Sequence, residues 1–282
     1  MVAMTLIAVL IALALDRYVS MLAKFRCYHW LGCYFHLAHK YLAKAKITNR
    51  LTTIILAVIP LVVVVVLLQC LFACFWYGIV GMIFNILILF YCLGSTTLFD
   101  PNAKPAKVAQ AATGGQGAKQ SQAAAGGQGA KQGQADTGLK TADAVLWAAN
   151  VRFFAIIFWF VIFGAVGALV YRLVLLLQDD GESAAAKKHL KLVQDYADWI
   201  PVRLLGLGFA LVGNFAKCFT AWVKGVLSWP SNNEAFLKAC GAGAMDVGGN
   251  GNKVEDAAYM VDRTLIVFLV VLALMTLAAW IS

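Results

Sequence analysis

The chain has 282 residues, of which 62% are hydrophobic and only 13% are charged. A soluble domain is typically about 45–50% apolar and about 25% charged, so this composition excludes an ordinary soluble protein. Residues 51–93 contain no Asp, Glu, Lys or Arg, although a soluble helix of that length would need charges on its solvent face. We therefore expect an all-α fold, a polytopic integral membrane protein with about five transmembrane or membrane-embedded helices and an interfacial amphipathic helix.

The net charge of +9 comes from basic residues that are grouped beside the hydrophobic segments. Of the 23 basic residues, seven lie within 17–50 and five within 101–140. Basic residues beside membrane spans set the orientation and contact lipid headgroups, so the excess charge does not indicate a nucleic-acid partner. With an external amino terminus, both groups fall on the cytoplasmic side, as the positive-inside rule requires.

The first apolar segment, 2–15, is short for a hydrocarbon core of roughly 30 Å. A cleaved signal peptide is the alternative, because 12–14 resembles a cleavage site. However, a signal peptide has a basic region before its apolar run, and no Lys or Arg precedes this one. We therefore expect a retained first span.

Residues 17–46 have the pattern of an amphipathic helix that lies in the membrane interface, because polar residues recur at steps of three and four among aromatic ones. The polar stripe comprises Arg26, His29, Cys33, His36 and Lys40. Together with His39, its histidines and cysteine have a spacing that one helix can offer to a metal, but a closed site needs further ligands. Headgroup contact is the favoured interpretation, and we expect no metal and no other cofactor. The odd number of cysteines, seven, argues against a disulfide framework.

Segments 51–68 and 76–97 are expected to form a tight transmembrane hairpin, in which the lone polar residue Asn85 makes an interhelical hydrogen bond. The following segment has a different composition. A twelve-residue unit is repeated in 111–122 and 123–134 with two changes, and its Gly, Ala, Gln and Lys content cannot bury a core. The predicted organisation is an N-terminal membrane region 1–98, a disordered linker 99–143 and a C-terminal membrane region 144–282.

The C-terminal region is expected to alternate between apolar helices and polar segments. In it, Gly164 and Gly167 offer places where a neighbouring helix can approach closely. Segment 200–217 leaves two topologies open: if it crosses the membrane, the carboxyl terminus is external, and if it lies along the surface, the terminus is cytoplasmic. The expected elements are a span at 152–171 continued by 173–177, a polar helix at 179–198, the apolar segment 200–217, a loop at 230–252 and a final span at 264–281.

Asp198, Pro201 and Arg203 form the strongest candidate for a functional group of residues. Pro201 can occupy the first turn of a helix, and Asp198 just before it can cap the free backbone N–H groups. Arg203 then faces an apolar run, where an isolated charge seeks a carboxylate or phosphate partner. Two interpretations remain open, a structural Asp198–Arg203 ion pair and a contact with an anionic ligand. Arg152 and Arg172, at the two ends of a span, are typical of snorkelling anchors.

Two stretches carry a resemblance to a known family. The first comprises 144–164 and 167–172, with its Phe-Trp-Phe and Tyr-Arg sequences, and the second is the motif Asp-Trp-Ile-Pro-Val-Arg at 198–203. Together with an opening apolar run that ends in Asp16-Arg17, they resemble the bacterial AmpE family. The resemblance implies an inner-membrane protein associated with the regulation of inducible β-lactamase, in a setting where peptidoglycan is recycled by a cytoplasmic amidase.

AmpE proteins are in turn similar to the CobD/CbiB membrane enzymes of cobalamin synthesis, which attach an aminopropanol arm to the corrin ring. Those enzymes share the Pro-x-Arg region and the Phe-Trp span, and just ahead of that span they carry a Glu-Asn-x-x-Asp-like pattern. Here the corresponding place reads Ala-Ala-Asn-Val-Arg at 148–152, so that Asn150 corresponds and the carboxylates do not. This departure argues against amide-forming chemistry.

The sequence therefore favours an inner-membrane regulatory or signalling protein of the AmpE type, associated with β-lactamase induction and cell-envelope sensing, with no catalytic residue. A membrane-bound biosynthetic enzyme of the CobD/CbiB type is the alternative. The predicted location is the bacterial inner (cytoplasmic) membrane, multi-pass, with the linker 99–143 in the cytoplasm. The expected partners are the lipid bilayer, an anionic or phosphorylated small molecule and other cell-envelope proteins, but no nucleic acid. The expected ligand-binding residues are Asn150, Arg152, Arg172, Asp198 and Arg203.

Overall fold

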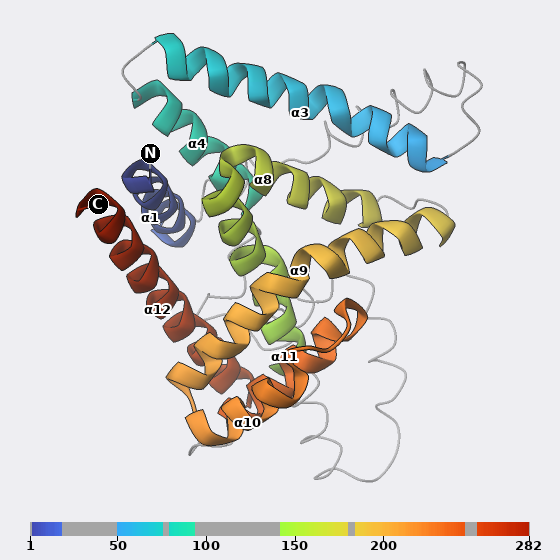
Figure 1. Cartoon of the computed structure of the whole chain (residues 1–282), viewed down its shortest axis with the longest axis vertical. Helices are drawn as coiled ribbons and strands as arrows, with labels where there is room; N and C mark the ends of the chain where they lie inside the picture. The colour runs from blue at the N-terminus through green and yellow to red at the C-terminus, as the bar shows by residue number, and fades with distance from the viewer. Residues whose placement is uncertain are drawn as a thin grey trace. The chain divides into compact units, whose positions relative to one another are not determined.

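The computed structural model of the chain describes residues 2–18, 50–75, 79–93, 142–179, 184–245 and 253–281. Every regular element within these ranges is helical (Figure 1), which confirms the all-α prediction for this part of the chain. Most of the predicted interfacial helix, including His29, Cys33, His36 and His39, lies outside the described residues, as do positions 99–141 of the predicted linker.

The elements of the described part of the chain include eight α-helices, one π-helix and one short 3-10 helix, and residues 142–149 are also helical. They are α1 (Val2–Tyr18), α3 (Arg50–Phe75), α4 (Ile79–Cys92), the π-helix η3 (Asn150–Phe154), α8 (Ala155–Asp179), α9 (Ala184–Val212), α10 (Phe215–Gly225), the 3-10 helix η4 (Pro230–Asn232), α11 (Asn233–Ala244) and α12 (Lys253–Ile281). The residues form two compact units, one drawn from 1–93 and 156–195 and the other from 94–155 and 196–282.

In the first unit, α1 packs against α4, and α3 also contacts α4. The small residues Ala8 and Ala12 of α1 are fully buried, which allows the close packing. Between α3 and α4, Gln69 Nε2 donates a hydrogen bond of 3.1 Å to Asn85 Oδ1. This bond confirms the prediction that Asn85 links two helices, since an amide in an apolar helix needs a partner of this kind.

Helix α8 is bent at Gly164, so that it consists of two arms (Figure 1). The backbone of Gly164 has φ 67° and ψ −154°, a combination that is essentially restricted to glycine. A Cβ on Gly164 would lie 3.5 Å from Nε2 of Gln69 in α3, whereas a Cβ on Gly167 would lie 2.4 Å from the carbonyl oxygen of Trp159. The close approach at Gly167 therefore comes from the first arm of α8 itself and not from a neighbouring helix.

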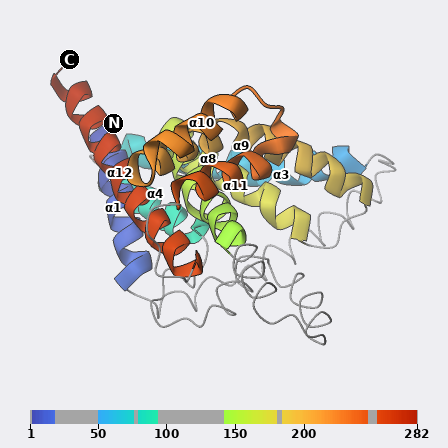
Figure 2. The ribbon, with the colours of Figure 1, turned by 90° about the horizontal axis from the view of Figure 1, so that it is seen from below.

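In the second unit, α10 and α11 lie side by side (Figures 1 and 2). Gly243 of α11 permits this contact, because a Cβ there would lie 3.1 Å from Cα of Cys218 in α10. Phe154, at the end of the π-helix, packs edge-to-face against Phe268 of α12, with ring centroids 5.9 Å apart. Aromatic packing of this kind joins α12 to the π-helix.

The prediction that a helix begins near Pro201 is wrong. Helix α9 runs from Ala184 to Val212 and holds Pro201 in its interior, although proline removes one backbone donor from a helix. Residues after the proline, such as Val202 and Phe209, are completely buried. We attribute the continuity of α9 to this packing, because tertiary contacts outweigh local propensity in most protein helices.

The predicted loop 230–252 is also corrected over its first half. Pro230–Asn232 forms the 3-10 helix η4, and Asn233–Ala244 forms α11. Glycines within 230–252 suggested a loop, but Gly241 packs within α11 at a site where a Cβ would lie 2.2 Å from a methyl group of Leu146. Glycine here serves close packing of a helix and not a turn.

Within the described residues, two helical stretches are long and apolar enough to cross a membrane, Ala142–Gln178 and Lys253–Ala278. The first of these includes the Gly164 bend. Shorter apolar helical segments are Leu6–Leu15, Ile59–Leu71 and Val80–Cys92. The final helix is longer than predicted, since α12 begins at Lys253. The total of about five membrane spans stays a prediction.

Candidate functional site

The π-helix η3 places Asn150 in the interior of the second unit. Its last turn closes with the N–H of Ala155 donating to the carbonyl oxygen of Asn150, the i to i+5 pattern that inserts an extra residue into a helix. Asn150 is completely buried, and so are its neighbours Ala148 and Phe153. An uncharged amide in such apolar surroundings requires a polar partner.

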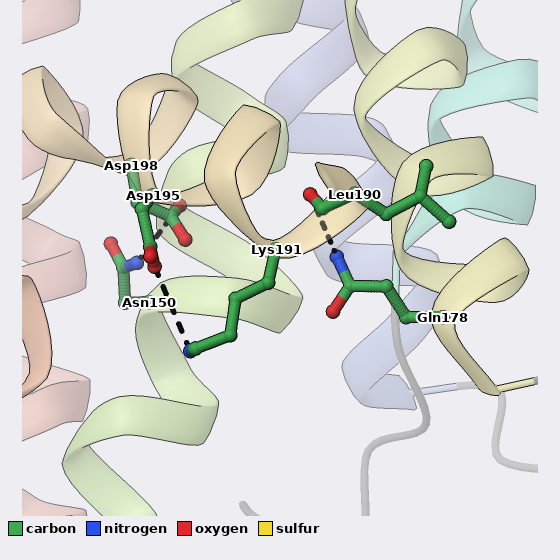
Figure 3. Close-up of polar contacts among 6 residues, drawn as sticks. All are labelled: Asn150, Gln178, Leu190, Lys191, Asp195 and Asp198. Carbon is green, nitrogen blue, oxygen red and sulfur yellow. Dashed lines mark hydrogen bonds and ion pairs between the residues drawn. The ribbon is translucent and has the colours of Figure 1, made fainter. Parts of the chain in front are cut away.

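That partner is Asp198 of α9. The side-chain Nδ2 of Asn150 donates a hydrogen bond of 3.2 Å to Oδ1 of Asp198 (Figure 3), and both residues have an exposed fraction of 0%. The prediction that Asp198 caps the start of a helix is therefore wrong. Asp198 lies inside α9 and joins this helix to the π-helix. Oδ1 of Asn150 has no hydrogen-bond partner among the described residues, so one acceptor in this buried pair is left unused.

The preceding turns of α9 continue the polar face that begins at Asp198 (Figure 3). Gln194 and Asp195 are also buried, with exposed fractions of 7% and 6%. The ammonium group of Lys191 lies 3.7 Å from the Asp195 carboxylate. A salt bridge with a partner as exposed as Lys191 contributes little stability, so its main effect is to direct the Asp195 side chain along the helix.

Arg203 lies one turn and a half beyond Asp198 and is bound to a different part of the chain. Its Nε donates to the carbonyl oxygen of Val226 at 3.2 Å, and its Nη2 donates to the carbonyl oxygen and the hydroxyl of Ser228 at 2.9 and 3.0 Å. Its Nη1 donates to the carbonyl oxygen of Trp199 at 3.2 Å and to Oδ1 of Asn233. An arginine has five N–H donors, so the guanidinium is fully used by protein acceptors.

Two aromatic rings enclose the same guanidinium. Its central carbon lies 4.8 Å from the ring centroid of Trp199 and 4.9 Å from that of Phe236 in α11, which are distances for cation–π attraction. Trp199 Nε1 donates to the carbonyl oxygen of Ser228 at 3.1 Å, and Trp222 Nε1 donates to that of Arg203 at 2.9 Å. Arg203 thus holds together α9, the segment after α10, and α11. We call this set of contacts the Arg203 clamp.

Of the two interpretations of Arg203 from the sequence, the geometry favours a structural role, but with other partners. The clamp acceptors are carbonyl oxygens, a hydroxyl and an amide, while Asp198 bonds to Asn150. Burial lowers the pKa of Arg203, yet an arginine remains protonated in proteins. The charge is therefore permanent, and the carbonyl dipoles and the two rings compensate for it.

A thiol pair lies close to the clamp. Cys218 of α10 and Cys240 of α11 are both completely buried, and Cys218 Sγ also contacts the carbonyl oxygen of Gly206 at 3.6 Å. A hydrogen bond with Cys218, together with burial, raises the pKa of the Cys240 thiol strongly. A thiol in such a site is a packing residue and not a nucleophile.

The five predicted site residues are divided between the two compact units. The structure joins Asn150 to Asp198, places Arg152 two residues after Asn150 in the π-helix, and assigns Arg203 to the clamp. Arg172 belongs to the other compact unit, where it lines an apolar cavity. Ser228 and Asn233 are not identifiable from the sequence, because neither lies in a motif and their partner Arg203 is 25 and 30 residues away along the chain.

The buried pair contains one acceptor, Oδ1 of Asn150, without a hydrogen-bond partner among the described residues, and an amide oxygen can accept from any N–H or O–H donor. No group of three or more His, Cys, Asp or Glu residues with metal-binding geometry occurs among the described residues. The π-helix reads Asn-Val-Arg-Phe-Phe and therefore carries no carboxylate.

Comparison with known proteins gives one match over nearly the whole chain. Residues 4–281 match the family described as "Regulatory signalling modulator protein AmpE". The chain is also similar to two proteins named cobalamin biosynthesis protein CobD. The one from Chromobacterium violaceum is 33% identical over 113 residues, and the one from Stutzerimonas stutzeri is 30% identical over 115 residues.

The similarity to these two relatives is confined to part of each protein. The matched residues make up 38% and 37% of this chain, and 36% of each relative. The chain therefore spans about a third of the length of the curated relatives it matches. No solved structure is significantly similar to it. The match to the regulatory family covers almost every residue, and the chain therefore belongs to the AmpE family.

Proposed function

We propose that the chain is a multi-pass regulatory protein of the bacterial inner membrane that modulates β-lactamase induction in response to the state of the cell envelope. The observation that carries the proposal is the match of residues 4–281 to a family of regulatory signalling modulators. Membrane placement is supported by the two long apolar helical stretches, Ala142–Gln178 and Lys253–Ala278. The basic groups at 17–50 and 101–140 favour an orientation with the linker in the cytoplasm.

In this proposal, a small polar ligand binds at the Asn150–Asp198 pair and thereby changes the signalling state of the protein. Asp198 is completely buried, and a buried carboxylate is costly unless it is paired or hydrogen-bonded. One member of the pair, Asn150, also lies on a π-helix, an irregularity that occurs often at functional sites. Arg152, on the same π-helix, supplies a positive charge for an anionic group on the ligand.

The decisive experiment measures β-lactamase activity in the native host, with and without an inducing β-lactam. It compares wild type, a clean deletion, and the deletion strain carrying the intact gene. We expect the deletion to change the induced activity and the intact gene to restore it. An unchanged induction in the deletion strain would show that the regulatory proposal is wrong.

The same strain tests the site through Asp198→Asn. Loss of the charge weakens a charge-assisted hydrogen bond, so we expect the inducer concentration for half-maximal response to shift about tenfold. Asp256→Asn, in the first turn of α12, removes the same charge elsewhere and should behave as wild type. Immunoblots of the membrane fraction establish that both variants are present. Equal responses of the two variants would contradict a role for the pair.

A second candidate function is a membrane-bound biosynthetic step of the CobD type. It is favoured by the two partial matches at 33% and 30% identity. Against it stands the sequence Ala-Ala-Asn-Val-Arg at 148–152, which lacks the acidic residues of the resembling enzymes. The test is growth of a strain that lacks its own cobinamide-amidating enzyme, on medium that demands corrinoid synthesis. Growth restored by this gene would support the CobD-type function. Absence of growth, although the protein is expressed, would exclude this function.

A further inference from the structure

A second site of the molecule lies in the first compact unit. A cavity of about 570 Å³ is lined by fourteen residues, five from α3, five from α4 and four from α8. Thirteen of them are uncharged, mostly aliphatic and aromatic side chains, and the one charged member is Arg172 of α8. The volume lies in the range of ligand-binding pockets, which are typically about 300–1,000 Å³ and largely apolar.

The cavity is open at the surface of the unit. Val64 of α3 and Leu87 of α4 both line it, and they have exposed fractions of 54% and 59%. The surface around them is also apolar, since Ile59, Val63 and Leu67 of α3 are 46–61% exposed. In a membrane-embedded helix, such a surface contacts lipid chains. The occupant with access to this cavity is therefore a lipid chain.

Arg172 adds a selective element to the apolar wall. Its side chain is half-buried and lies in the lining with Leu169, Leu173 and Leu176 of the same arm of α8. Arginine presents a planar fork of donors that matches the oxygens of a phosphate group. A basic residue in a pocket between membrane helices is typical of sites for anionic headgroups.

We propose that this cavity binds one acyl chain of an anionic phospholipid of the surrounding bilayer, with the lipid phosphate at Arg172. The proposal assigns Arg172 a different ligand from the Asn150–Asp198 pair. It rests on the membrane placement proposed above, but not on any role in β-lactamase induction. Failure of lipid binding would leave the induction experiment unaffected, and the reverse also holds.

The test is native mass spectrometry of the purified full chain in detergent, titrated with phosphatidylglycerol or with phosphatidylcholine of the same acyl chains. We expect the wild type to bind the first phosphatidylglycerol about tenfold more tightly than phosphatidylcholine, the difference that a single charge-assisted contact provides. Arg172→Gln should remove this preference, and Arg172→Lys should retain most of it. Arg263→Gln, which removes an exposed charge from α12, is the matched control and should leave the preference unchanged.

A second pair of variants tests the cavity independently of the charge. Leu68→Trp places a large side chain into the cavity, which Leu68 lines, and should weaken the binding of both lipids. Leu56→Trp, at an exposed position of the same helix that is not part of the lining, should have no effect. The proposal is overturned if Arg172→Gln keeps the preference for phosphatidylglycerol, or if Leu68→Trp binds both lipids as the wild type does.

Discussion

Arg203 is the residue whose role changes most between the sequence and the structure. Its position in an apolar run marks it as unusual, and that much is predictable because a lone charge must find compensation. The compensation itself was not predictable. It comes from Val226 and Ser228, which follow α10, and from Asn233, which lies in the segment 230–252 that the glycine and asparagine content assigned to a loop. Only the folded chain brings these acceptors to α9.

Replacing Arg203 by lysine should destabilise the protein. Lysine keeps the charge but has only three donors, all on one nitrogen, so it cannot serve the five acceptors of the clamp. It also lacks the planar guanidinium that contacts the rings of Trp199 and Phe236. We expect a loss of about 2 kcal/mol in the free energy of unfolding, measured as a lower melting temperature of the detergent-solubilised protein. Arg263→Lys, at an exposed position, is the control. Identical melting of the two variants would contradict a structural role for the clamp.

For the Asn150–Asp198 pair, the two residues were predictable from the sequence but their contact was not. Both residues belong to the stretches on which the family resemblance rests, so each was a predictable candidate. That they contact each other was not predictable from a separation of 48 residues. Nor does the sequence around Asn150 reveal a π-helix, since its residues are compatible with an ordinary α-helix.

Among the elements, long apolar helices were the easiest to predict. The segments at 2–15 and 264–281 are confirmed as parts of α1 and α12, because nothing competes with a helix in a continuous apolar run. The two errors, at Pro201 and in 230–252, have the same origin. In each case, a residue that usually ends a helix is retained inside one by packing, as for Gly241 against Leu146.

The bend of α8 at Gly164 is an element-scale feature with a clear test. Gly164→Ala forces an L side chain into dihedral angles that cost of order 1–3 kcal/mol, so we expect a loss of about 2 kcal/mol in the free energy of unfolding. The cost comes from the strained backbone dihedral angles and not from contact with a neighbouring side chain, because the nearest side-chain atom is 3.5 Å from the added Cβ. Thermal melting in detergent provides the measurement.

Thr276→Ala serves as the comparison for this variant, since the Thr276 hydroxyl is exposed and bonds only to a carbonyl of its own helix. It should melt close to the wild type. If Gly164→Ala also does so, then α8 straightens at no cost, and the bend is not enforced by the packing of the first unit.

At the scale of the whole molecule, the unsettled matter was whether 200–217 crosses the membrane. The structure divides this segment: α9 ends at Val212, and α10 begins at Phe215 after an N-cap at Asn214. From Pro201 to the end of α9 the helix rises only about 18 Å, short of a hydrocarbon core of roughly 30 Å. Within the described residues, α9 is also not among the stretches that are long and apolar enough to span.

Helix α10 has instead the character of an interfacial helix. Phe215, Phe219 and Val223, at successive steps of four, are 37–52% exposed on one side, and Phe215 stacks on Phe219 with ring centroids 5.1 Å apart. Lys217 and Lys224 are also exposed. Exposed aromatic residues combined with lysines are typical of helices that lie at the headgroup level. This pattern favours the topology in which 200–217 does not cross.

The carboxyl terminus should therefore be cytoplasmic when the amino terminus is external. With 200–217 at the surface, the span in α12 returns the chain to the side that holds the basic linker, which satisfies the positive-inside rule.

Reporter fusions measure the location of the carboxyl terminus directly, because alkaline phosphatase is active only outside the inner membrane and green fluorescent protein fluoresces only when folded inside. We expect a carboxyl-terminal fusion to fluoresce and to lack phosphatase activity, and a fusion within 101–140 to behave in the same way. A fusion placed directly after α8 should show phosphatase activity and serves as the control for the opposite side. Phosphatase activity at the carboxyl terminus would mean that 200–217 crosses after all, and that Arg203 with its five acceptors lies within the bilayer.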